Sequence, residues 1–311
     1  MLMGAVPHER LLNDPHVSTE TKDKLLEISE ILAFARKLGL SHNGQYETIN
    51  PTFHARIHNV VAAPRLSFAA KTWWFPIVGT VPYLGFFEER DARHLERALH
   101  QEGFDTAVRT AGAYSTLGWF KDPILPHMLI WSEYRTANTL FHELTHATTW
   151  ITGSAEFNES FANYVGQKGA LSYMAAKYGN SSEQLKEIEM ALDDRTTAHE
   201  IIENVKIELE QIYENEEDPI WVRIAKKRAV LASIPFRLAS DTLHDSSTTI
   251  RAYRQNEWNN ATLRQFGTYN SNVDYFDKIF IECDSDVKRF IQRLDALSEA
   301  NEIPIALFVS K

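Results

Sequence analysis

Two histidines with a glutamate between them are the residues of this chain best suited to chemistry. They stand in the run His142-Glu143-Leu144-Thr145-His146. On a helix, residues four apart lie on one face about one turn apart, so both imidazoles can reach a single zinc ion. Glu143 directly follows the first histidine and would point toward a metal-bound water. The pattern therefore predicts a zinc-dependent hydrolase with a carboxylate as general base.

The residues around this run indicate a buried helix. Gly153 offers a stop after it. A buried helix that carried these polar side chains without a metal would leave several polar groups to satisfy in the core, which is costly. Apolar residues recur at intervals of three and four, as an amphipathic helix requires: Ala137, Leu140, Phe141, Leu144, Ala147, Trp150 and Ile151.

A third zinc ligand should follow, because catalytic zinc usually takes three protein ligands and one water. Residues 154–164 supply two candidates, Glu156 and Glu159, which are three apart and would share a helical face. Spacing alone does not choose between them. Glu159 lies further into an apolar run, where an ionised carboxylate needs a strong partner such as a metal. Glu156 is nearer the turn, where a carboxylate simply favours the helix dipole. We predict Glu159 as the ligand and keep Glu156 as the alternative.

Several longer motifs carry a family resemblance. The His-Glu-x-x-His run is followed by FNESFA at residues 157–162 and preceded by AYSTLGWFKDP at residues 113–123. Further matching stretches are NVVAAP at 59–64, WFPIVG at 74–79, the Asn259-Asn260-Ala261-x-Leu263 block and Thr268-Tyr269. Together they resemble a bacterial family of predicted aminopeptidases of the glutamate-zincin type, along most of the chain.

The resemblance implies a zinc metallopeptidase, and its label adds action on peptide N-termini. This chain departs from the family where members are expected to carry cysteines, since it has Trp74 and Thr80 there. A disulfide in that stretch is therefore impossible, but no predicted ligand is affected. Family members generally resemble exported or lipid-anchored proteins, so we expect a periplasmic or membrane-anchored protein whose leader is absent from this sequence. Without a leader it would be cytoplasmic.

The remaining periodicity predicts an α+β fold, with a zincin-like core of a small sheet and the active-site helix. Residues 19–38 should form an amphipathic helix and residues 89–101 another. Short strands and turns are expected over 57–87, and a further strand over 104–116. Residues 128–131 are our candidate for the edge strand along the cleft, which could pair with an extended substrate.

The sequence predicts that the C-terminal half is mainly helical. Long charged helices over residues 182–241 should form a hairpin that turns at Pro219, with the acidic run 214–218 as a solvated loop at its tip or, alternatively, a recognition surface. We divide the chain into a catalytic region at 1–180, with its N-terminal helix, and a helical region at 181–311 that closes the cleft. The two are expected to pack as one compact unit.

The expected chemistry assigns a role to each site residue. One zinc per chain, held by His142, His146 and Glu159, would lower the pKa of its water, and Glu143 would accept the water's proton. A neutral donor should stabilise the oxyanion. Tyr269 is the first candidate for this role and Tyr114 the second, although either could equally be a core or rim aromatic. Asn158 and Asn163 could orient the ligands, or Asn158 could act as a helix cap.

Composition limits the partners. A chain of 311 residues that is 44% hydrophobic can bury a sizeable core. Its net charge of −10 argues against nucleic acid, because phosphate binding needs clustered cations. The single cysteine, Cys283, rules out an intrachain disulfide, and no apolar stretch reaches the length of a membrane span. The oligomeric state is not indicated.

The function we predict is that of a zinc peptidase acting on peptide N-termini. A group that binds the substrate's free amine is required, and Glu156 and Glu133 are both candidates. Two alternatives belong to other classes: a zinc-containing binding or scaffold protein without useful turnover, and a hydrolase of a non-peptide amide. Glu143 favours an enzyme, because structural zinc needs no base and commonly has four protein ligands.

Overall fold

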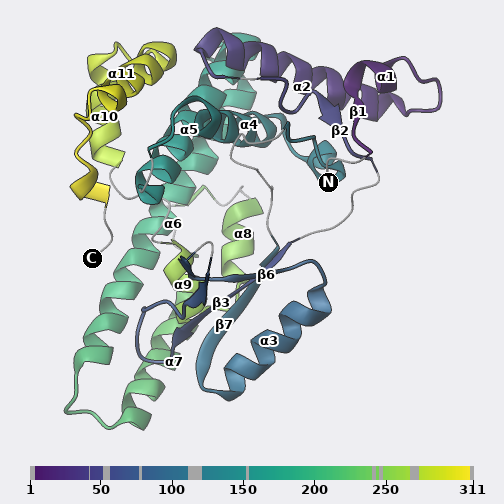
Figure 1. The fold of residues 1–311 in the computed structure, drawn as a ribbon. Coiled ribbons are helices and arrows are strands. Elements are labelled where there is room, and N and C mark those ends of the chain that lie inside the picture. Colours follow the sequence, from purple (N-terminus) through teal and green to yellow (C-terminus); the bar gives the residue numbers. More distant parts are fainter. Residues whose placement is uncertain are drawn as a thin grey trace. The chain divides into compact units, whose positions relative to one another are not determined.

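The computed structural model describes residues 4–41, 43–51, 57–76, 79–110, 121–151, 154–239, 243–244, 248–266 and 273–308. Over these residues helices predominate and the strands form small antiparallel sheets, so the predicted α+β class is confirmed (Figure 1). None of the helices described is both long enough and apolar enough to cross a membrane.

Contacts group the chain into two compact units that interleave along the sequence. The first unit takes in Met1–His54, Ala113–Leu185 and Asn270–Lys311. The second takes in Ala55–Gly112 and Lys186–Tyr269. The division at residue 180 stays a prediction about folding units, because packing contacts do not test which part folds alone.

In the first unit, α2 (Thr19–Leu38) confirms the predicted N-terminal helix. Ser18 begins it by accepting a hydrogen bond from the Thr21 amide, and Gly39 ends it in the left-handed region at φ 89°. The side chains that recur every three or four residues are buried, as predicted, and α2 contacts α4. These buried residues are Leu25, Ile28, Ile31, Leu32 and Ala35.

Helices α4 (Glu133–Thr148) and α5 (Ala155–Tyr178) pack closely against each other in the first unit (Figure 1). Ser132 begins α4 with its hydroxyl on the Arg135 amide. The helix ends at Thr148 because Thr149 is extended, at φ −133° and ψ 121°. This is earlier than the sequence predicted, and Gly153 lies outside the described residues.

Two glycines of α5 allow this close approach. A Cβ added at Gly166 would lie 2.8 Å from the Asn138 carbonyl oxygen and 3.2 Å from the His142 Cβ. One added at Gly169 would lie 2.9 Å from the ring of Phe141. Because glycine has no side chain at these two positions, α5 can lie close to α4 beside His142 and Phe141.

The predicted edge strand over residues 128–131 is wrong. The structure has a 3₁₀ helix there, η1 (Pro126–Ile130), with a turn-type bond from the Met128 amide to the Leu125 carbonyl at 2.9 Å. Pro126 favours this because its fixed φ suits the first turn of a helix. The carbonyl of Trp131 is taken by Lys24 of α2 at 2.7 Å instead of by a neighbouring strand.

The rest of the first unit surrounds these helices. An aromatic cluster joins α5 to the C-terminal helices through Phe157, Phe161, Phe276, Phe290 and Phe308, all of which are buried. Apart from α5, the cluster draws on α10 (Val273–Glu282), α11 (Val287–Glu299) and η3 (Ile305–Phe308). The first unit also contains β1 (Val6–Pro7), α1 (His8–Leu12) and β2 (Thr48–Ile49).

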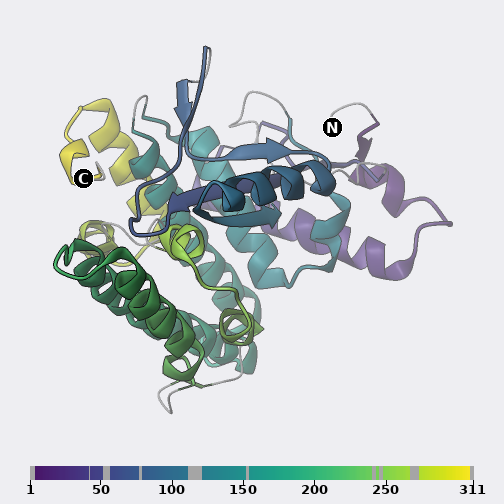
Figure 2. The ribbon, with the colours of Figure 1, turned by 90° about the horizontal axis from the view of Figure 1, so that it is seen from below.

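The second unit contains a three-stranded antiparallel sheet with β3 in the centre. β3 (His58–Pro64) pairs with β6 (Leu84–Phe86) on one side and β7 (Phe104–Thr110) on the other. Helix α3 (Glu89–Gln101) lies along the sheet and buries Ala92 and Leu99 against Val60 and Ala62 (Figure 2). The strands predicted within 57–87 and the helix over 89–101 are confirmed.

The remaining strands of this unit form a separate hairpin, in which β4 (Trp73–Phe75) pairs with β5 (Gly79–Val81). The strand expected over 104–116 is present as β7 to Thr110, and residues 111–116 lie outside the described part.

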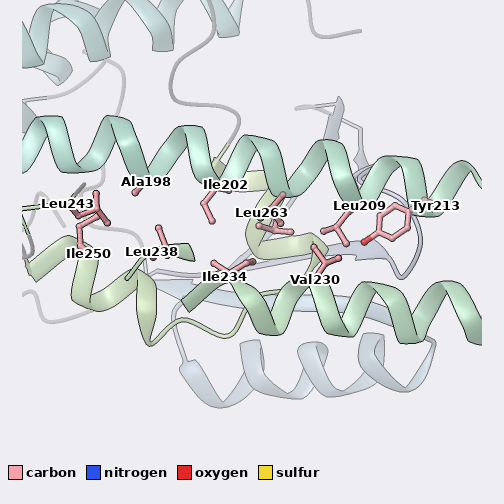
Figure 3. Packing of buried hydrophobic residues seen from close by; sticks show 11 residues of the cluster. Ala198, Ile202, Leu209, Tyr213, Val230, Ile234, Leu238, Leu243, Ile250 and Leu263 are labelled. Atoms are coloured by element: carbon pink, nitrogen blue, oxygen red, sulfur yellow. The ribbon is translucent and has the colours of Figure 1, made fainter. Parts of the chain in front are cut away.

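The predicted helical hairpin is confirmed in the second unit. Helix α6 (Glu183–Glu214) and helix α7 (Ile220–Arg237) run against each other over a continuous apolar core (Figure 3). Pro219 precedes α7, and the acidic turn at 214–218 is mostly exposed, as expected of a solvated tip. Helices α8 (Thr248–Arg254) and α9 (Asn260–Phe266) complete this core.

Candidate metal centre

The structure brings together the three side chains predicted as zinc ligands. His142 and His146 project from α4, and Glu159 projects from α5. The two Nε2 atoms are 3.2 Å apart. Glu159 places Oε2 3.6 Å from the His142 Nε2 and Oε1 3.5 Å from the His146 Nε2. Two nitrogens and one carboxylate thus face a common point between the helices.

The separation of the two imidazole nitrogens fits a tetrahedral zinc ion. Ligand atoms about 2.0–2.1 Å from one ion at tetrahedral angles lie about 3.3–3.4 Å from each other, and the two Nε2 atoms are 3.2 Å apart. Glu159 directs a different oxygen toward each imidazole, and one ligand atom from each of the three residues lies within 4.8 Å of the others. Imidazole nitrogen with carboxylate oxygen is also a donor set that zinc accepts in catalytic sites.

The electrostatics of the cluster suit a cation. Burial lowers the pKa of His142 to about 3, with a further contribution from His146, while a hydrogen bond between the ring and the Asn163 side chain opposes the shift. Burial likewise lowers the pKa of His146 to about 4. Both imidazoles are therefore neutral at neutral pH, the form that binds a metal. Partial desolvation raises the pKa of the Glu159 carboxyl, although this side chain is 54% exposed and water weakens the effect. A bound cation would act in the opposite direction.

Two asparagines proposed to orient the ligands have separate roles. Asn163 hydrogen-bonds the His142 ring, as an orienting residue should. Asn158 instead fixes the loop between α4 and α5: its Oδ1 accepts from the Ile151 amide at 2.9 Å, and its Nδ2 donates to the Ile151 carbonyl at 2.8 Å. The buried His146 Nδ1 has no hydrogen-bond partner among the described residues.

The carboxylates considered for other roles are not equally close to the cluster. Glu143 follows His142 on α4 and is partly buried, and Glu156 lies one turn before Glu159 on α5. Glu133 is the first residue of α4, nine positions before His142, which corresponds to about 14 Å along a helix. The expectation that Glu133 lies near the site is therefore wrong.

Glu133 is instead part of a network that ties α4 to α5. Its carboxylate accepts from the Tyr173 hydroxyl and the Lys177 ammonium, each at 2.6 Å, and from the Tyr178 hydroxyl at 2.5 Å. Burial alone would raise the pKa of Glu133, but these hydrogen bonds hold it below its ordinary value.

Tyr269 and Tyr114, the candidates for the oxyanion donor, both lie outside the described residues. Two other residues at the centre were not selected from the sequence. Gly166 lies against the His142 Cβ, and Trp150 contacts the His146 ring with centroids 5.6 Å apart. A signal for Gly166 did exist, because glycine inside a helix costs about 1 kcal/mol relative to alanine and so suggests a packing requirement.

Comparison with known proteins gives one match. A family model described as "Putative aminopeptidase" matches residues 1–303. Neither the curated proteins nor the solved structures that were compared gave a match.

Proposed function

We propose that this chain, which belongs to the family described as "Putative aminopeptidase", is a zinc-dependent peptidase of the glutamate-zincin type that acts on peptide N-termini. The observation that carries the proposal is the convergence of the His142, His146 and Glu159 side chains on one point between α4 and α5. Family membership supports a peptidase, and the donor set supports zinc as its metal.

Each residue of the centre has a proposed task. When bound, zinc lowers the pKa of water and polarises the scissile carbonyl. His142, His146 and Glu159 hold the ion, and Asn163 keeps the His142 ring in its orientation. Glu143 accepts the proton of the attacking water and returns it to the leaving amine. Tyr269, or else Tyr114, donates to the developing oxyanion.

Recognition of the free amine is assigned to Glu156. It lies one turn before Glu159 on α5, whereas Glu133 lies nine positions before His142, at the opposite end of α4. A carboxylate one turn from a metal ligand can hold the terminal ammonium of a peptide while the first peptide bond meets the metal.

Metal content tests the centre directly. Mass spectrometry of the wild type should give about one zinc per chain, and His146→Ala and Glu159→Ala should lose it. Glu156→Gln is the matched control on the same helix and should keep its zinc. Wild-type protein without zinc, or full retention in Glu159→Ala, would contradict the ligand set.

Turnover tests the general base. Glu143→Gln should keep zinc and lose peptide hydrolysis by a factor on the order of 10²–10⁴. Tyr269→Phe should lower kcat by about 10²-fold with zinc kept, and Tyr114→Phe is its comparison. A zinc-loaded wild type that cleaves no peptide would remove the peptidase claim, and hydrolysis of non-peptide amides would then be examined.

Acetylation of the substrate tests the action on N-termini. Peptides with a free amine should be cleaved and N-acetylated ones should not, and Glu156→Gln should reduce that difference. Equal cleavage of both would remove the aminopeptidase part and leave the peptidase intact.

A further inference from the structure

An exposed tryptophan lies directly beside the metal centre. Trp150 follows Thr149 at the end of α4, and its ring meets the His146 ring edge-on, with centroids 5.6 Å apart and planes at 70°. The residue is 44% exposed, although His146 beneath it is buried. A large apolar surface is thus open to solvent next to a proposed zinc ligand.

The backbone on both sides of Trp150 is held in place. The Thr149 amide donates to the Thr145 carbonyl at 2.9 Å, and the Thr149 hydroxyl donates to Asp295 of α11 at 3.1 Å. On the other side, the buried Asn158 binds both the amide and the carbonyl of Ile151. The backbone that carries the indole is therefore fixed by hydrogen bonds. When a ligand covers the indole, this segment loses little conformational entropy.

Binding sites commonly combine such apolar walls with a few placed polar groups. Tryptophan suits this role because it offers a large rigid surface at low entropic cost. Here the polar groups are the His142, His146 and Glu159 side chains, and the apolar surface starts at the ring of one of them.

We propose that Trp150 is a specificity-determining wall of the substrate site, which receives a large apolar or aromatic side chain next to the scissile peptide bond. The enzyme then prefers peptides with such a residue at that position over peptides with glycine. The inference rests on the proposed function, because it takes the metal centre as the place where the peptide bond lies.

Amino-acid hydroxamates separate the side-chain contact from the metal contact. The hydroxamates of phenylalanine and glycine share one chelating group and differ in the side chain. Titration of the zinc-loaded wild type should give an affinity for the phenylalanine derivative about tenfold or more above that for the glycine derivative. In Trp150→Ala this ratio should fall to about threefold or less, while zinc content and affinity for the glycine derivative stay within about threefold.

Trp131→Ala is the matched control. Trp131 precedes the opposite end of α4 and contacts Arg135 and His127, at about 20 Å along the helix from His146. It should leave the ratio unchanged. Trp150→Phe, which keeps an aromatic wall, should retain most of the preference.

The outcomes separate a failure of this inference from a failure of the proposed zinc peptidase function on which it rests. A zinc-loaded Trp150→Ala with an unchanged ratio would overturn the substrate wall alone. An equal loss for both hydroxamates would also overturn it, since Trp150 would then act only by supporting His146. A wild type that takes up no zinc would overturn the proposed function and this inference together.

Discussion

The two compact units differ in how a cluster of polar side chains is partnered. In the second unit the protein supplies the partners of a buried asparagine and a buried lysine, whereas in the first unit three side chains converge on one point. Asn260 of α9 is fully buried in the second unit. Its Nδ2 lies 2.9–3.2 Å from the carbonyl oxygens of Pro64, Arg65 and Ser67, and its Oδ1 accepts from the Tyr213 hydroxyl at 2.7 Å. Asn260 therefore connects the turn after β3 to Tyr213 of helix α6 through hydrogen bonds.

A buried ion pair completes the cluster of the second unit. The ammonium of Lys227 on α7 contacts the Asp105 carboxylate of β7 and donates to the Arg65 carbonyl at 2.8 Å. Asp105 also accepts a hydrogen bond from the Asn260 backbone amide at 2.8 Å. Burial lowers the pKa of Lys227, and the contact with Asp105 opposes that shift.

The cluster of the first unit is different. The nitrogens of His142 and His146 face each other and Glu159, and the Nδ1 of His146 is buried without a partner among the described residues. A buried polar cluster whose members find partners within the protein stabilises the fold. The members of the first cluster instead converge on a shared point, and the Glu159 side chain is 54% exposed, which is the arrangement expected of a binding site under the proposed function.

The largest predicted effect on stability comes from breaking the complete cluster. Asn260→Ala should lower the free energy of unfolding by about 3–5 kcal/mol, because it leaves buried carbonyl groups without a donor. Urea denaturation followed by circular dichroism measures this. Gln255→Ala, at an exposed position nearby, should change it by less than about 0.5 kcal/mol. A cost below about 1 kcal/mol for Asn260→Ala would contradict the network.

Removing the cation of the buried ion pair should come next. Lys227→Met should cost about 3 kcal/mol in urea denaturation, because it leaves the Asp105 carboxylate buried without its counter-charge. Its neighbour Lys226 forms an exposed ion pair with Asp218 at 2.5 Å, so Lys226→Met should cost less than about 1 kcal/mol. Adding Asp105→Asn to Lys227→Met should recover part of the loss. If Lys227→Met and Lys226→Met lowered the free energy of unfolding equally, the buried ion pair would not differ from the exposed one, and the prediction would be contradicted.

The two clusters also differ in how far the sequence could predict them. His142, Glu143 and His146 lie within one helical turn, so their geometry follows from helix periodicity alone. Glu159 was selected over Glu156 because of the apolar residues around it, and the distances to both imidazoles agree with that choice. The hairpin of α6 and α7 was predictable for the same local reason, since its apolar stripe is periodic.

What sequence reasoning could not predict depends on distant partners. The Asn259-Asn260 block was visible as a motif, but its role comes from carbonyl groups about 195 positions away, at Pro64 and Arg65. No local pattern encodes such a contact. The error at residues 128–131 has a related cause: a short apolar run fits either a strand or a helical turn, and here Pro126 and the contact with Lys24 decided it.

A smaller change should loosen the proposed metal centre without replacing a ligand. Gly166→Ala would push its Cβ against the Asn138 carbonyl and the His142 Cβ, so α5 must shift away from α4. We expect a loss of about 1–3 kcal/mol in unfolding free energy and weaker zinc binding by about tenfold, from competition with a chelator. Gly169→Ala meets the ring of Phe141, a side chain that can turn, and should affect zinc less. Unchanged zinc affinity in Gly166→Ala would show that the spacing does not position the ligands.

The last prediction is a pH dependence of the ligand cluster, an effect that is close to zero at neutral pH and appears only below pH 6.5. In the metal-free protein the folded-state pKa values of His142 and His146 are about 3 and about 4, below the ordinary value of 6.5. Between pH 6.5 and about 4 the unfolded chain therefore binds protons that the folded chain does not, so stability falls as the pH falls. Each histidine should contribute about 1 kcal/mol per pH unit to this slope.

Replacing both histidines isolates that contribution. In chelator, His142→Gln/His146→Gln should show a shallower fall of the unfolding free energy below pH 6.5 than the wild type. Part of the slope should remain, because burial also lowers the pKa of His8, which is not in the cluster. Lys226→Met, which removes a more exposed ion pair outside the cluster, is the control and should run parallel to the wild type. An unchanged slope in the double variant would mean that the two imidazoles are not held neutral by the fold, and that the cluster is not prepared for a metal.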